Sequence, residues 1–139
     1  MTLTVPHASV SQAAADKLIE AASAKASAMA LAMVIAVVDD AGVLKAFRRM
    51  DGAPLLSVEI AKDKAYTAAA YGMPTHAWFD FIKSDPPLLH GIVHTKRLVV
   101  FGGGYPVEVD GQIVGAIGVS GGHYSQDQEV AEAALQALK

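Results

Sequence analysis

Apolar side chains recur with helical spacing in the first part of the chain. Ala15, Leu18, Ala22 and Ala26 follow one another at steps of three and four residues, which predicts an amphipathic helix. A continuous apolar run at residues 33–38 is rich in β-branched side chains and predicts a buried strand. The chain therefore begins with one helix and one strand that can pack against each other.

The next elements form a hairpin and a pair of helices. The turn at residues 39–42 is too short for a crossover, so a strand at residues 43–48 is expected to pair antiparallel with the first strand. A helix then runs from residue 54 to a stop at Gly72, because glycine readily adopts the left-handed conformation of a helix C-terminus. A shorter helix at residues 76–83 ends before two prolines, and we expect residues 86–96 to be irregular.

The remaining segments predict three strands and a last helix. Residues 97–101, 107–109 and 112–119 have strand character and are separated by glycine-containing turns, and an Ala-rich helix covers residues 126–138. The sum is an α+β fold, a five-stranded antiparallel sheet flanked by helices in a profilin-like or PAS-like arrangement. No repeat or linker interrupts the pattern, so we predict a single domain at residues 1–139.

Composition indicates burial between subunits and excludes several classes of protein. Apolar residues make up 53% of the chain and aromatic residues only 6%. Small apolar side chains thus exceed what a monomer easily buries, which predicts a homo-oligomer. The net charge is −3, so the chain lacks the basic surface that binding to nucleic acid requires. No apolar run is long enough to span a membrane. No secretory signal is visible, so a cytoplasmic location is expected. The absence of cysteine excludes disulfides, thiolate metal sites and a cysteine nucleophile.

Five motifs, in order along the chain, together resemble one family. They lie at residues 36–39 with Gly42, 49–53, 61–68, 101–106, and 115–122 followed by 126–127. The chain resembles the GlcG/HbpS-like family of haem-binding or haem-degrading proteins, which also supplies the C-terminal domain of PduO-type corrinoid adenosyltransferases. Some members are similar to hydroxylaminobenzoate lyases. The resemblance implies a scaffold that forms a dimer built up to a tetramer or octamer, with ligand pockets near subunit contacts.

Two stretches depart from the family pattern, and both introduce histidine. Residues 90–97 stand where relatives more often have a polar or glycine-rich loop. His123 and Tyr124 stand where a small residue is more usual. These departures favour a pocket specialised for a particular ligand.

Histidines are the first candidates for ligand binding. The chain has five, and without cysteine they are the candidate axial ligands of a haem iron. The first hypothesis is therefore a protein that binds a small-molecule ligand, haem or a related planar cofactor. His76 or His94 would ligate the iron, and Arg48, Arg97 or Lys64 would lie near the propionates. Arg48 and Lys64 equally suit structural ion pairs.

Two glycine turns are candidate backbone sites for a ligand. Gly103 belongs to a turn that leads into a strand, so it suits a positive φ or a close approach better than a phosphate site. Gly121 and Gly122 lead into the last helix, whose N-terminal end favours anions. The second turn is therefore the better anion site.

The alternative hypothesis is a cofactor-independent lyase that acts on a small aromatic carboxylate such as a hydroxylaminobenzoate, as the resemblance implies. The carboxylate would lie at the start of the last helix or on an arginine, and His123, Tyr124, Tyr105 and Glu108 would transfer protons. His123 equally suits a surface position before a helix cap. A third possibility is an accessory subunit that binds no small molecule.

Overall fold

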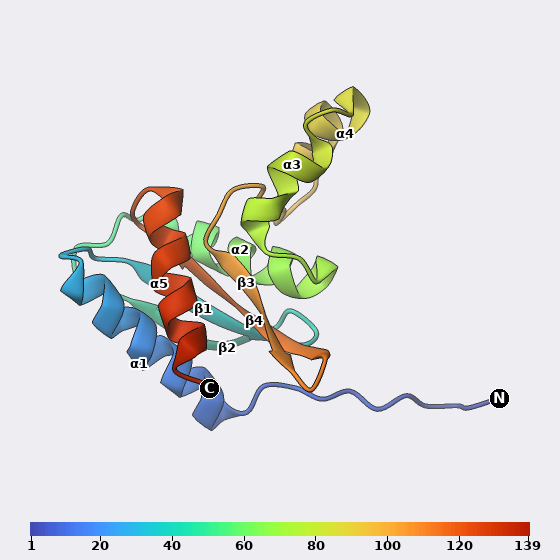
Figure 1. Cartoon of the computed structure of the whole chain (residues 1–139), viewed down its shortest axis with the longest axis horizontal. Helices are drawn as coiled ribbons and strands as arrows, with labels where there is room; N and C mark the ends of the chain where they lie inside the picture. Colours follow the sequence, from blue (N-terminus) through green and yellow to red (C-terminus); the bar gives the residue numbers. More distant parts are fainter.

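An antiparallel sheet organises the chain, and helices cover both of its faces (Figure 1). In the computed structural model, which describes residues 1–139, the strands lie in the order β2 (Leu44–Arg49), β1 (Val34–Asp39), β4 (Gln112–Ser120) and β3 (Gly104–Val109). The predicted α+β class and the antiparallel sheet flanked by helices are confirmed. The prediction of five strands is wrong, because the sheet has four.

The predicted strand at residues 97–101 is an irregular segment, because a helix side chain takes over its hydrogen bonds. Thr67 lies in helix α2 (Ser57–Tyr71). Its hydroxyl donates to the carbonyl oxygen of Arg97 at 2.7 Å and accepts from the amide of Val99 at 3.0 Å. Arg97 also has a φ of 65°, a left-handed conformation that does not continue a strand. The segment is therefore held against α2 instead of against a neighbouring strand.

The two faces of the sheet bury different kinds of side chain. On one face, Ile35 and Val37 of β1 pack with helices α1 (Gln12–Ala28) and α5 (Tyr124–Gln136). On the other face, the alanines of α2 pack onto the alternate positions of β1. Because helices cover both sides of β1, its sequence is a continuous apolar run instead of an alternating one.

Glycine lets α2 lie very close to the sheet. A Cβ atom at Gly118 of β4 would stand 2.0 Å from the carbonyl oxygen of Ala61, and one at Gly104 of β3 would stand 2.5 Å from that of Lys64. No other residue type permits so close a backbone approach. This contact fixes α2 across β3 and β4 and brings Lys64 under the segment that precedes β3.

Short helices between α2 and β3 form an arm that extends away from the sheet (Figure 1). The expectation that residues 86–96 are irregular is wrong. Asp85 accepts from the amide of Leu88, and prolines occupy the first turn of a helix, where their missing N–H is not needed. The arm consists of η1 (Thr75–Ala77), α3 (Trp78–Ile82), α4 (Pro86–Gly91) and η2 (Ile92–His94).

No helix of the chain combines the length and apolar character needed to span a membrane.

Candidate functional site

Two adjoining cavities lie beside the N-terminus of α5, the first next to the base of the arm and the second next to the start of α2. The first cavity has a volume of about 500 Å³ and the second about 360 Å³. Both volumes fall in the range of small-molecule sites. The half-exposed rings of Phe101 and Tyr124 line both cavities. A ligand in either cavity therefore contacts the same two rings.

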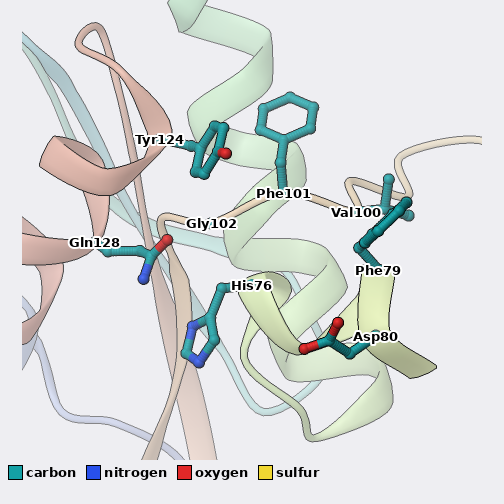
Figure 2. Close-up of a pocket in the computed structure, with 8 residues that line it drawn as sticks. All are labelled: His76, Phe79, Asp80, Val100, Phe101, Gly102, Tyr124 and Gln128. Carbon is teal, nitrogen blue, oxygen red and sulfur yellow. The ribbon is translucent and has the colours of Figure 1, made fainter. Parts of the chain in front are cut away.

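Three segments of the chain build the wall of the first cavity, and Figure 2 shows their side chains around it. The arm contributes side chains of η1 and α3, and α5 contributes side chains of its first two turns. The third part of the wall comes from the irregular segment before β3. The wall combines three aromatic rings with an imidazole, a carboxylate and a primary amide. The lining residues are His76, Phe79, Asp80, Val100, Phe101, Gly102, Tyr124 and Gln128.

His76 is the only imidazole on the wall of the first cavity. Its ring has no hydrogen-bonding partner in the chain, and its centroid lies 5.4 Å from that of Tyr105. The hydroxyl of buried Tyr105 donates to the carboxylate of Glu132, and burial raises the pKa of Tyr105. Tyr105 is therefore a fixed, protonated support behind His76. On the same wall, an ion pair of 2.8 Å with Lys83 lowers the pKa of Asp80.

The second cavity lies where β4 leads into α5. His123 is the N-cap of α5: its Nδ1 accepts from the amide of Ser125 at 3.2 Å, and the side chain of Gln126 accepts from the His123 amide at 2.9 Å. These two bonds form a capping box, which fixes the imidazole at the cavity wall. The lining residues are Pro54, Leu56, Ser57, Ile60, Phe101, Ser120, Gly121, Gly122, His123, Tyr124 and Asp127.

A buried ion pair stands behind the second cavity. Lys64 has no exposed surface, and its Nζ donates to Asp127 Oδ2 at 2.7 Å and to the Val119 carbonyl oxygen at 2.9 Å. The other oxygen of Asp127 accepts from the amide of Gly122 at 3.0 Å. Burial lowers the pKa of Lys64 and raises that of Asp127, and the charge of each partner opposes the shift. A Cβ at Gly103 would stand 2.7 Å from Nζ, so glycine there leaves room for the pair.

Several predicted site residues lie on the two cavities. His76 and Tyr124 line the first. Gly121, Gly122 and His123 line the second together with Tyr124. Residues that are far apart in the sequence thus meet where the arm, β4 and α5 converge.

Other predicted site residues lie elsewhere. His94 is exposed in η2 and lines neither cavity, and Arg48 of β2 forms an ion pair with Glu20 of α1. Glu108 is exposed on β3, and Tyr105 is buried behind His76. The four residues predicted to transfer protons in a lyase therefore do not share one cavity.

Six of the eight lining residues of the first cavity were not predicted as site residues, and Phe101 and Gln128 show why. Phe101 belongs to the segment predicted as a strand, where its side chain has no reason to face a ligand. Gln128 lies one helical turn after Tyr124, so the two side chains share one helix face. That spacing was a usable signal, but the predicted helix began at residue 126 and left Tyr124 outside.

The fold is a small α+β domain with two adjoining cavities beside the N-terminus of its last helix. The family model described as "Haem degrading protein HbpS-like" matches residues 10–136. The chain therefore belongs to the HbpS-like family, which confirms the resemblance of its motifs.

Similar proteins support this membership over nearly the whole chain. A 15.0 kDa protein of the dhaT-dhaS intergenic region of Citrobacter freundii is 41% identical over 133 residues, covering 94% of this chain and 93% of that protein. The crystal structure of Klebsiella pneumoniae protein ORFY has a TM-score of 0.93 at 34% identity, covering 99% of this chain and 95% of that one. The crystal structure of a PduOC–haem complex has a TM-score of 0.86 at 35% identity, covering 93% and 94%.

Proposed function

We propose that the protein binds haem or a related planar ring in the first cavity, with His76 as the axial ligand. The observation that carries the proposal is the imidazole of His76, which has no hydrogen-bonding partner and lines a cavity of about 500 Å³ among aromatic rings. The similarity to PduOC, whose structure contains haem, supports the same class of ligand.

The residues of the first cavity fit a haem. No three histidine, aspartate or glutamate side chains come together as a metal-binding group, but a haem iron needs only axial ligands from the protein. Phe79, Phe101 and Tyr124 offer flat apolar surfaces for a ring system. The iron, when bound, would supply the Lewis-acid and redox chemistry of the site.

The protein's own residues would hold and orient the ring. Tyr105 packs against the His76 ring, which restricts the directions that the imidazole can take. The cations predicted to lie near propionates are Lys64, Arg48 and Arg97. They are engaged with Asp127, Glu20 and Asp63 respectively. The acidic groups of the ligand therefore need other partners.

The test is an absorption titration of the purified protein with haem. The wild-type protein is expected to give a Soret band characteristic of a histidine-ligated iron, and His76→Ala is expected to lose it. His90→Ala is the matched control, because His90 lies on α4 and lines neither cavity. A band of equal intensity and position in His76→Ala would rule out this ligand.

We also propose that the protein is a homo-oligomer in which a second copy covers the arm. Helix α4 has six residues and no buried side chain, although Leu88 and Val93 of the arm are apolar and exposed. So short a helix gains little stability by itself in water. Sedimentation of the wild type is expected to show an oligomer and that of Leu88→Asp/Val93→Asp a smaller species. A monomeric wild type would contradict this proposal.

A further inference from the structure

The wall of the second cavity contains hydrogen-bond donors that have no acceptor within the chain. The amides of Gly121 and Tyr124, both on its wall, donate to no atom of the protein. The N-termini of two long helices, α2 and α5, meet at the same wall through Leu56 and Tyr124. Leu56 is the N-cap of α2 and provides no side-chain acceptor. The positive ends of both helix dipoles thus face one cavity.

Two buried serines add a donor that is independent of the helix ends. Ser57 and Ser120 line the cavity, and each is only 5% exposed. The hydroxyl of Ser120 donates to that of Ser57 at 3.2 Å. This bond uses one of the two hydroxyl protons, and no atom of the chain accepts the other. Because both serines line the cavity, that proton can be donated to a ligand oxygen there.

His123 contributes a further donor. Its Nδ1 accepts from the amide of Ser125 at 3.2 Å and lies 2.8 Å from the Ser125 hydroxyl oxygen, which can donate to it. In this arrangement the neutral ring carries its proton on Nε2. His123 lines the second cavity, and we assign Nε2 as its donor to a ligand there. The capping box holds this nitrogen in place without any ligand.

The one acidic side chain on the wall does not oppose an anion. Both oxygens of Asp127 are occupied, one by Nζ of Lys64 and the other by the amide of Gly122. The charge of Lys64 balances that of Asp127 in the same buried pair. The remaining polar side chains of the wall belong to Ser57, Ser120, His123 and Tyr124, and none of them is acidic like Asp127.

We propose that the second cavity binds a carboxylate, the acidic group of the ligand whose ring lies in the first cavity. The shared rings of Phe101 and Tyr124 join the two cavities, so one molecule can reach both. The ligand class is thus a planar ring that bears at least one carboxylate. The link between the cavities rests on the proposed function, whereas the carboxylate site itself is testable alone.

The experiment compares haem with haem dimethyl ester, which lacks free carboxylates. The wild type is expected to bind haem at least about tenfold more tightly than the ester, the effect of one hydrogen bond to a charged group. His123→Asn keeps a good N-cap residue but removes Nε2. Ser57→Ala/Ser120→Ala removes the hydroxyls and is an independent variant if the first misfolds. Both are expected to lower the affinity for haem while leaving that for the ester unchanged.

A histidine outside both cavities provides the control for these variants. His90→Asn, on α4 and outside both cavities, is expected to keep the full preference for haem. A preference of the same size in both cavity variants would overturn the proposal, and so would a wild type that binds haem and its ester equally.

A second readout separates this proposal from the haem proposal. If the wild type binds neither porphyrin, the haem proposal fails, and benzoate is titrated while backbone amide resonances are followed by NMR. Shifts at Gly121, Gly122 and Tyr124 would support the carboxylate site if His123→Asn lowers the benzoate affinity derived from them about tenfold. No shift at these amides, or shifts that the variant leaves unchanged, would overturn it.

Discussion

The body of the protein and its arm are stabilised in different ways. In the body, β1 is buried between helices on both faces, and a fully buried lysine has its own buried carboxylate. In the arm, α3 is anchored by Trp78 and Ile82, but α4 has no buried residue. The difference shows that the body supplies most of the stability and the second cavity, whereas the arm contributes mainly to the wall of the first cavity. The body determines whether the protein folds, and the base of the arm completes the wall of the first cavity.

The largest expected effect is the loss of one partner of the buried ion pair. Asp127→Ala leaves the charge of Lys64 buried and unpaired, which is expected to lower the free energy of unfolding by about 3–5 kcal/mol. Urea unfolding followed by circular dichroism measures the change. Glu59→Gln is the control, because its pair with Lys62 is exposed and is expected to contribute less than about 1 kcal/mol.

The double variant Lys64→Met/Asp127→Leu sharpens this result. It removes both charges together, so it is expected to be more stable than Asp127→Ala. A double variant as unstable as the single one would mean that the shape of the site, and not the unpaired charge, causes the loss.

A matched pair of glycine substitutions tests body and arm directly. In Gly118→Ala the new Cβ would stand 2.0 Å from the carbonyl oxygen of Ala61, so α2 must move, at an expected cost of about 1–3 kcal/mol. In Gly91→Ala the new Cβ meets no atom within 4 Å, and the helix propensity of α4 improves by up to about 1 kcal/mol. Thermal unfolding of both variants measures the contrast, and equal losses of stability would contradict it.

The smallest expected effect is a dependence of stability on alkaline pH. Burial raises the pKa of Tyr105 above the ordinary 10.0, so the folded state holds this proton more tightly than the unfolded chain. The resulting stabilisation is complete below pH 10 and is lost as pH rises, by at most about 1.4 kcal/mol per pH unit. Tyr105→Phe removes this contribution. Its free energy of unfolding is expected to fall less steeply than that of the wild type between about pH 9 and about pH 11, and parallel curves would contradict the assignment.

Local sequence signals were sufficient for most of the fold. The C-terminal stop of α2 at Gly72 is confirmed, because a left-handed residue with φ of 75° is what glycine favours. The hairpin of β1 and β2 is confirmed, because a short turn between apolar runs permits little else. The strand at residues 97–101 failed because Thr67, about thirty positions earlier, competes for its hydrogen bonds. No local pattern contains that information.

The candidate site was less predictable than the fold, for the same physical reason. His76, His123 and Tyr124 were singled out by residue type, and their roles stay predictions. The neighbours that make them a site come from three segments joined only by tertiary packing. Lys64 was left between a structural and a ligand-binding role, because its partner Asp127 is 63 residues away.

The same separation has a consequence for how the protein is made. A ribosome releases α2, with Lys64 in it, well before Asp127 has been added. Until then the amine has no counter-ion, and β1 lacks β4 along one of its edges. Ordered burial of α2 against the sheet must follow the synthesis of β4 and the first turn of α5. We expect this protein to reach its native state only when nearly all of these residues have emerged, and to depend on protection of its apolar segments before that point.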